Sequence, residues 1–153
     1  MALGLCGVTM VQRDYILRMI EELGAALIAL RKAIFKGSVG EARVEATLRR
    51  AASGAGMDLD LARAASAESL PGMMAPTGEV EPMRCWLLAE VLMTDGINRL
   101  HAGEDDRARS SLARAAALFR MVGPWGAYLT GFPEASERIE EIEGILAGMG
   151  TGG

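Results

Sequence analysis

The chain has 153 residues, half of them hydrophobic and only 5% aromatic, and its formal net charge is −4. This length suits a single domain that can bury a substantial core, and aliphatic, alanine and methionine side chains must fill it. The acidic balance, with a sequence pI near 5.1, argues against nucleic acid as a partner.

The same composition gives no sign of a metal site, a disulfide framework or a membrane span. Cys6 and Cys85 lie far apart, and no CxxC motif or cysteine–histidine cluster accompanies them. The mean hydropathy is +0.20, but no apolar run approaches the roughly 20 residues that cross a bilayer. The opening segment lacks the basic start and apolar length of a signal peptide. We therefore expect a cytoplasmic protein without cofactor or metal.

The first predicted element is a long amphipathic helix over Gln12–Lys36. Its apolar residues alternate at spacings of four and three, as in the seam of a coiled coil. They are Ile16, Ile20, Leu23, Leu27, Leu30 and Ile34. The seam needs a cover, which is another part of the same chain, a second copy, or a membrane surface. Residues 1–10 are predicted to be a disordered extension, and Met10 is an alternative native start.

Three weaker elements follow. A helix is expected over Glu41–Ala52, and Asp58 is expected to cap a short helix that runs to Ala65. Proline and glycine then become frequent, so Pro71–Pro82 is predicted to be the main loop.

The centre of the chain, Trp86–Arg120, is typical of two helices joined by a turn at Gly103. The second helix carries one apolar face, formed by Ala108, Leu112, Ala115, Phe119 and Val122. The first helix is apolar on two sides and is therefore expected to pack on both. Gly103 is predicted to end it with a positive φ, since glycine adopts the left-handed conformation without a Cβ clash.

This hairpin resembles a tetratricopeptide repeat. Small residues stand at the positions where the repeat has them, namely Gly96, Gly103, Ala108 and Ala115, with Leu92 and Leu112 at two larger positions. The resemblance departs at Asp95 and Arg99, where leucine and tyrosine are usual. It implies an all-α fold of antiparallel helical hairpins, and it would place Met93, Ile97 and Leu100 on the concave, ligand-binding side.

A second resemblance covers most of Met10–Phe119. The run MVQRDYILRMIEELGAAL, with its DYILRMIE core, is similar to the opening of a family of uncharacterised bacterial helical proteins. In that family an N-terminal amphipathic helix precedes tetratricopeptide-like hairpins, and the later LLAEVL run fits the same layout. The resemblance implies a fold and no activity.

The last third of the chain closes the domain. Trp125, Tyr128 and Phe132 are three of the seven aromatic residues, and they predict a small satellite core or a binding hot spot. The final helix presents Ala135, Ile139, Ile142 and Leu146 on one face. Residues 150–153 are expected to fray, which leaves 11–149 as a single helical domain.

Chemistry-bearing motifs are missing from the sequence. There is no phosphate-binding loop, hydrolase elbow, zinc-protease motif or dinucleotide fingerprint, and His101 is the only histidine. Asp95 and Arg99 stand four residues apart, which predicts an intrahelical ion pair. The functional alternative is a polar anchor that orients a partner's terminus. A closed polar pocket containing Asp95, Arg99 or His101 would favour a small-molecule enzyme instead.

We therefore predict a non-enzymatic helical protein-interaction or scaffold module that forms a homodimer. Its predicted surface combines Ile16, Ile20, Leu23, Leu27 and Leu30 with Met93, Ile97 and Leu100. Either the N-terminal helix folds back onto its own hairpin, or two chains pair through these residues. The alternative is a peripheral membrane protein bound through that helix. The sequence identifies no particular partner or oligomer number.

Overall fold

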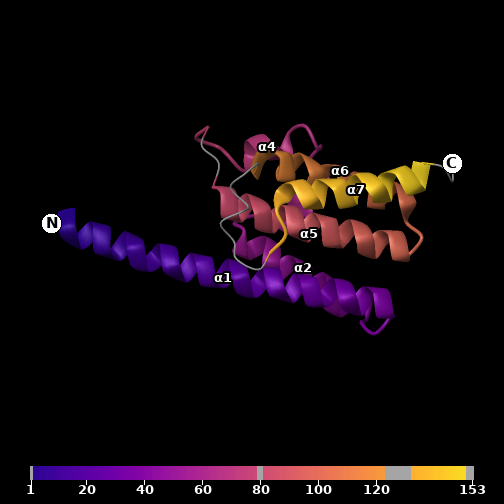
Figure 1. Cartoon of the computed structure of the whole chain (residues 1–153), viewed down its shortest axis with the longest axis horizontal. Helices are drawn as coiled ribbons and strands as arrows, with labels where there is room; N and C mark the ends of the chain where they lie inside the picture. The colour runs from indigo at the N-terminus through magenta and orange to yellow at the C-terminus, as the bar shows by residue number, and fades with distance from the viewer. Residues whose placement is uncertain (1, 79–80, 123–131, 151–153) are drawn as a thin grey trace.

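The computed structural model describes residues 2–78, 81–122 and 132–150, and side chains in these ranges from residue 14 to residue 149. Within these ranges every regular element is a helix, so the all-α prediction is confirmed (Figure 1). The helices are α1 (Ala2–Lys36), α2 (Glu41–Gly54), α3 (Leu59–Ala64), α4 (Leu70–Met73), α5 (Pro82–His101), α6 (Asp105–Val122) and α7 (Ala135–Gly150).

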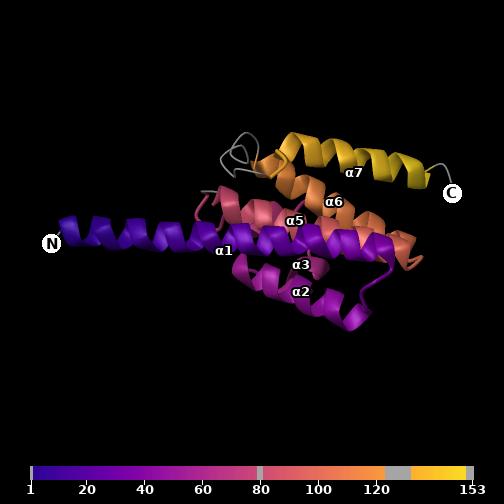
Figure 2. The ribbon, with the colours of Figure 1, turned by 60° about the horizontal axis from the view of Figure 1, so that its bottom comes forward.

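Helix α5 lies at the centre of the molecule. It contacts α1 and α2 on one side and α6 on the other, and α7 covers α6 (Figure 2). Every residue from Cys85 to Ile97 is buried, as expected for a helix that packs on several sides. Because this stretch includes Glu90, Thr94 and Asp95, the centre of the fold also contains polar groups that need partners.

The antiparallel α5–α6 hairpin confirms the predicted pairing of these two segments. Gly96 allows the two helices to approach closely, since a Cβ built there would lie 2.7 Å from Leu112 Cγ and 3.2 Å from the carbonyl oxygen of Ala108. The predicted face of α6 is buried from Ala108 to Val122. The small residues of the hairpin therefore serve helix-to-helix packing.

Gly103 ends α5 as predicted, with a φ of 79°. Its N–H donates to the carbonyl of Leu100 at 3.1 Å, and the N–H of Glu104 donates to the carbonyl of Arg99 at 2.9 Å. This pair of bonds is the Schellman arrangement, which satisfies the last carbonyls of the helix. The turn into α6 is thus set by local backbone chemistry.

Helix α1 begins at Ala2, ten residues before the predicted start at Gln12. Residues 1–10 are predicted to be a disordered extension, whereas residues 2–10 continue the helix in the structure. This stretch has no proline, and extending an existing helix requires fixing only one residue per added hydrogen bond. The N-terminal part of α1 projects beyond the other helices (Figure 1).

Two other predictions are refined. Asp58 caps α3 by accepting a hydrogen bond from the N–H of Leu61 at 3.0 Å. The predicted loop Pro71–Pro82 instead contains most of α4, with Pro71 in its first turn, where a missing N–H is harmless. Trp125, Tyr128 and residues 151–153 lie outside the described residues. No helix in the described part of the chain is both long and apolar enough to cross a membrane.

Candidate functional site

The predicted self-association surface is largely covered within one chain. Helix α1 packs along α5, and the seam and the α5 residues belong to one buried core cluster. Ile20, Leu23, Leu27, Leu30, Met93 and Ile97 are all buried. Of the two alternatives, the structure contains the one in which the N-terminal helix covers its own hairpin. The apolar stripe of α1 is therefore by itself no evidence for a dimer.

Gly24 brings α1 close to α5. A Cβ at this position would lie 3.0 Å from the Trp86 ring and 2.9 Å from the Phe132 ring. Trp86 and Phe132 meet edge to face, with ring centroids 5.1 Å apart. Helix α1, helix α5 and the segment that contains Phe132 therefore meet at Gly24.

The predicted self-association surface stays partly accessible only at its two ends. Ile16 and Leu100 are half-buried, and Tyr15, where α1 leaves the body of the molecule, is 71% exposed. Before Tyr15, residues 2–12 contain no charged side chain. The accessible part of the predicted surface is thus limited to Ile16 and Leu100, and the uncharged start of α1 lies next to Ile16 in the sequence.

The predicted Asp95–Arg99 ion pair is present. Arg99 Nε lies 3.1 Å from one carboxylate oxygen of Asp95 and 3.2 Å from the other. The carboxylate is only 1% exposed, and it also accepts hydrogen bonds from Arg63 at 2.7 Å and Ser111 at 2.6 Å. Asp95 therefore joins α3, α5 and α6.

Burial acts to raise the pKa of Asp95, but the hydrogen bonds from Arg63 and Ser111 and the charges of Arg63 and Arg99 outweigh it and leave the pKa below its usual value. Arg63 in turn has a raised pKa, chiefly because of its hydrogen bond to Glu45. Both terminal nitrogens of Arg63 donate to the Glu45 carboxylate, at 2.6 and 2.9 Å. These groups stay ionised through the neutral pH range.

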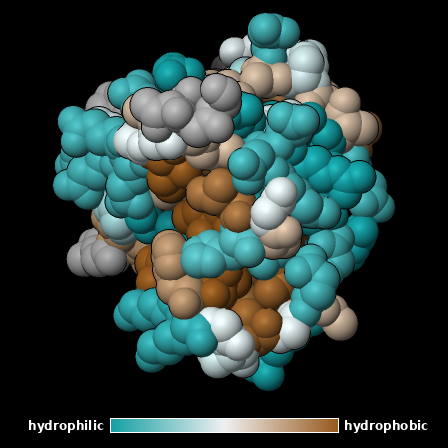
Figure 3. Space-filling view, turned by 90° about the vertical axis from the view of Figure 1, so that its right-hand side faces the viewer, coloured by the Kyte–Doolittle hydropathy of each residue, from teal (hydrophilic) through white to brown (hydrophobic). Residues whose placement is uncertain are grey.

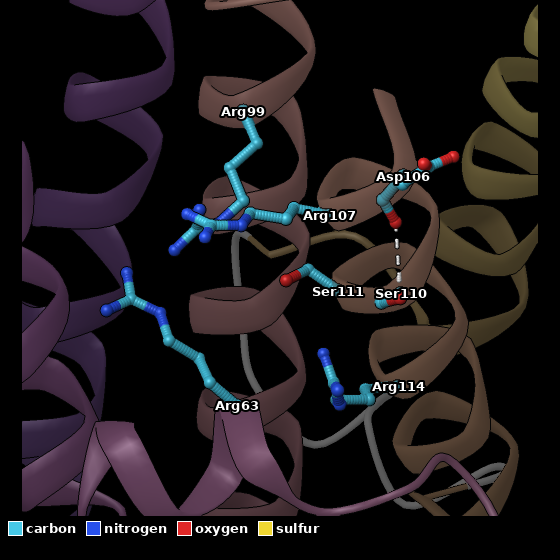
Figure 4. Close-up of a pocket in the computed structure, with 7 residues that line it drawn as sticks. All are labelled: Arg63, Arg99, Asp106, Arg107, Ser110, Ser111 and Arg114. Carbon is cyan, nitrogen blue, oxygen red and sulfur yellow. Dashed lines mark hydrogen bonds between the residues drawn. The ribbon is translucent and has the colours of Figure 1, made fainter. Parts of the chain in front are cut away.

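A pocket of about 340 Å³ opens above this cluster. Four arginines, two serines and one aspartate line it (Figure 4): Arg63, Arg99, Arg107, Arg114, Ser110, Ser111 and Asp106. In Figure 4 the guanidinium groups of Arg63, Arg99 and Arg107 lie on one side of the Ser111 hydroxyl, whereas the Asp106 carboxylate points away from them. The lining is strongly cationic in a chain of net negative charge.

The arginines differ in how they are paired. Arg63 and Arg99 contact the carboxylates of Asp95, Glu45 and Glu104. Arg107 approaches a carboxylate only at 3.8 Å, that of Glu104. Within the described residues Arg114 makes no ion pair; its Nε donates to the carbonyl of Ala65 at 2.6 Å, and burial lowers its pKa.

A second buried cluster holds α1, α5 and α7 together. The Glu90 carboxylate lies between Arg31, which hydrogen-bonds one of its oxygens, and Arg138, whose Nε donates to the other at 2.7 Å. Arg31 Nε also donates to Thr94 Oγ1 at 2.8 Å. Breaking such a triad would leave a buried charge without compensation, so its primary role is structural.

One end of the molecule carries an apolar strip (Figure 3). The C-terminal ends of α1, α5 and α7 meet at this end (Figure 1), where Leu100, Ile145 and Met149 line a shallow hollow. Phe35 is 64% exposed and meets the His101 ring edge to face at a centroid distance of 4.9 Å. The histidine thus takes part in a surface aromatic contact.

The described residues contain no group of three or more histidine, cysteine, aspartate or glutamate side chains placed to hold a metal ion. Cys85 is buried, and burial raises its pKa to about 12. No protein-family model, curated protein or solved structure matches the chain. The two family resemblances therefore stay predictions, and the local geometry carries the functional argument.

Sequence reasoning found Asp95 and Arg99 but missed the groups that surround them. Arg63, Ser111 and Arg114 come from other helices, and no local spacing links them to Asp95. Within α6, however, Arg107, Ser110 or Ser111, and Arg114 recur at helical spacing along one flank of the apolar face. That polar stripe was a usable signal for the pocket.

Proposed function

We propose that the chain is a non-enzymatic helical interaction module of the cytoplasm that associates with itself through the projecting part of α1. The observation that carries the proposal is that this part of α1 projects beyond the other helices (Figure 1). A helix with no charged residue over positions 2–12 leaves the body of the molecule at an exposed Tyr15. A helix without charged side chains along its length is normally covered by a neighbour, so this segment is the part of the chain that needs a partner.

A second copy of the same helix is the partner that the chain itself provides. Val8 and Val11 stand seven and four residues before Tyr15, a spacing that places residues on one side of a helix. Two such helices, aligned as a symmetric pair, would cover each other's apolar residues. Ile16, half-buried at the edge of the body, would lie at the inner end of this contact.

The test is the mass of the full-length chain in solution, measured by light scattering across a concentration series. We expect a mass twice the 16.2 kDa of one chain at high micromolar concentration. Val8→Glu combined with Val11→Glu should give the monomer, because burying unpaired carboxylates in a contact is costly. Ala42→Glu combined with Ala46→Glu adds the same charge at exposed positions of α2 and should leave the dimer intact.

Substitutions in the buried seam do not serve this test. Ile20 and Leu27 are fully buried inside one chain. An aspartate at either position would therefore unfold the chain, whether or not the wild type forms a dimer. A wild-type chain that stays monomeric at high micromolar concentration would contradict the dimer.

The uncharged start of α1 favours one alternative, a peripheral membrane protein. An apolar helix can lie in the interface of a bilayer, although residues 2–12 lack the basic side chains that usually accompany such binding. Co-sedimentation of the monomeric chain with phosphatidylcholine–phosphatidylglycerol vesicles, lost on Val8→Glu with Val11→Glu, would favour this alternative over self-association.

We also propose that the α5–α6 hairpin is packed in the manner of a tetratricopeptide repeat. The close approach of Gly96 to Leu112 and the Schellman turn at Gly103 support this assignment. In this chain the inner side of the hairpin is occupied by α1. Any peptide ligand would therefore have to bind at the rim, where Leu100 remains partly accessible.

A further inference from the structure

We propose that the arginine pocket between α3, α5 and α6 binds a phosphate group, as inorganic phosphate or as a small phosphate monoester. The proposal is independent of self-association, because the pocket lies on the body of the molecule and the projecting part of α1 contributes no residue to it.

The arginines of the pocket are unevenly paired. Arg63 and Arg99 are hydrogen-bonded to the carboxylates of Asp95, Glu45 and Glu104. Arg107 and Arg114 have no carboxylate within hydrogen-bond distance in the described part of the chain; Glu104 lies 3.8 Å from Arg107, and Asp95 acts on Arg114 at longer range. The donors of these two guanidinium groups are therefore available to a phosphate group, which forms strong charge-assisted hydrogen bonds with arginine.

The guanidinium groups reach the pocket from different helices. The guanidinium groups come from three elements, with Arg63 on α3, Arg99 on α5, and Arg107 and Arg114 two helical turns apart on α6. A planar carboxylate is matched by one forked guanidinium, whereas the tetrahedral oxygens of phosphate accept donors from several directions. The convergence of donors from three helices therefore favours phosphate over carboxylate.

The floor of the pocket is held in place by hydrogen bonds. Asp95 fixes Arg63, Arg99 and Ser111 in place through hydrogen bonds of 2.6 to 3.2 Å. Glu45 holds the Arg63 guanidinium from the other side. Side chains already positioned lose little conformational entropy when a ligand binds. The volume of about 340 Å³ falls in the range of small-molecule sites.

The test is isothermal titration calorimetry of the full-length chain with inorganic phosphate and with phenyl phosphate, at constant ionic strength set with chloride. The matched variants are Arg107→Gln with Arg114→Gln, and Arg50→Gln at an exposed arginine of α2 outside the pocket. Wild type and R50Q should bind equally, and R107Q/R114Q should bind about tenfold more weakly or worse, since two charge-assisted contacts are lost. Arg114→Lys should also weaken binding, because lysine keeps the charge but not the fork.

Far-UV circular dichroism checks that each variant is folded. If R107Q/R114Q does not fold, Arg107→Gln alone decides, because its side chain is 71% exposed and supports no buried contact. Three results would overturn the proposal: no heat above chloride at millimolar phosphate, unchanged affinity in the folded arginine variant, or acetate binding as tightly as phosphate. Tighter binding of phenyl phosphate would identify a monoester as the ligand, and equal binding would identify the phosphate group alone.

Discussion

At the scale of single residues, the carboxylate of Asp95 links three helices below the pocket. One carboxylate accepts from two guanidinium groups and a hydroxyl while almost fully shielded from water. A buried charge is costly unless it is paired and hydrogen-bonded, and here both conditions hold. The ionised form is therefore the one that the folded state favours.

Asp95 should make the stability of the protein depend on pH at the acid end. Its folded-state pKa is below the unfolded value of about 3.9. The stabilisation is therefore fully present above that value and is lost as the pH falls through the folded pKa. Urea unfolding at pH 6 and pH 3 should show a larger loss for wild type than for Asp95→Asn, which cannot titrate.

A matched control is Asp60→Asn. Asp60 also has a lowered pKa, because of its hydrogen bond to Arg49, but it is exposed to solvent, where ion pairs contribute little. Its substitution should leave the pH dependence of unfolding close to that of wild type. An Asp95→Asn protein that loses as much stability in acid as wild type would show that other carboxylates control the transition.

The residue scale also shows where sequence reasoning ends. The Asp95–Arg99 pair was predictable, since a spacing of four residues brings two side chains together on any helix. The contacts of Asp95 with Arg63 and Ser111 were not, because they depend on how α3 and α6 pack against α5. Glu90 lies within the apolar run WLLAEVLM, which indicates that its carboxylate needs charged partners. The sequence does not indicate that these partners are Arg31 and Arg138.

At the scale of elements, the α5–α6 hairpin depends on one small residue. Ala is normally the better helix former, by about 0.5–1 kcal/mol over Gly. At Gly96, however, the added methyl group would meet Leu112 and the backbone oxygen of Ala108. A carbonyl oxygen in a helix cannot move aside as a flexible side chain can. The steric cost of about 1–3 kcal/mol therefore exceeds the gain in helix propensity.

Gly96→Ala should therefore lower the free energy of unfolding by on the order of 1 kcal/mol or more, measured by urea denaturation. Gly144→Ala provides the control, since this glycine also lies within a helix but no atom lies within 4 Å of the added Cβ. That change should be neutral or stabilising by up to about 1 kcal/mol. Equal effects at the two positions would mean that α5 and α6 are not as close as the structure has them.

Element types and most boundaries followed from local patterns. The hairpin, its turn at Gly103 and the cap at Asp58 were predictable because each rests on a few consecutive residues. The start of α1 and the short α4 were not. An apolar segment without charges has no amphipathic period to identify it as a helix, and the Pro71-Gly72 pair is a loop signal that a helical first turn also tolerates.

At the scale of the whole molecule, the sequence revealed two apolar surfaces but not what covers them. The seam of α1 and the inner side of α5 are complementary, and one chain is long enough for the first to lie along the second. Periodicity identifies a face to be buried and is silent on whether the partner is the same chain or another. The part of α1 that extends past α5 has no such neighbour among the described helices (Figure 1).

Amide hydrogen exchange should distinguish the packed helices from the projecting part of α1. Helix α5, which is surrounded by α1, α2 and α6, should exchange most slowly, because its amides open only with most of the fold. The amides of residues 3–14 project beyond that packing and should exchange fastest among the helices at low protein concentration. If two copies pair through this segment, raising the concentration should slow its exchange, since mass action favours the paired state. The amides of α7 provide the internal reference and should exchange at the same rate throughout. Exchange in residues 3–14 that is equally fast at every concentration would contradict self-association through α1, while slow exchange in α5 would still support the packing described for the single chain.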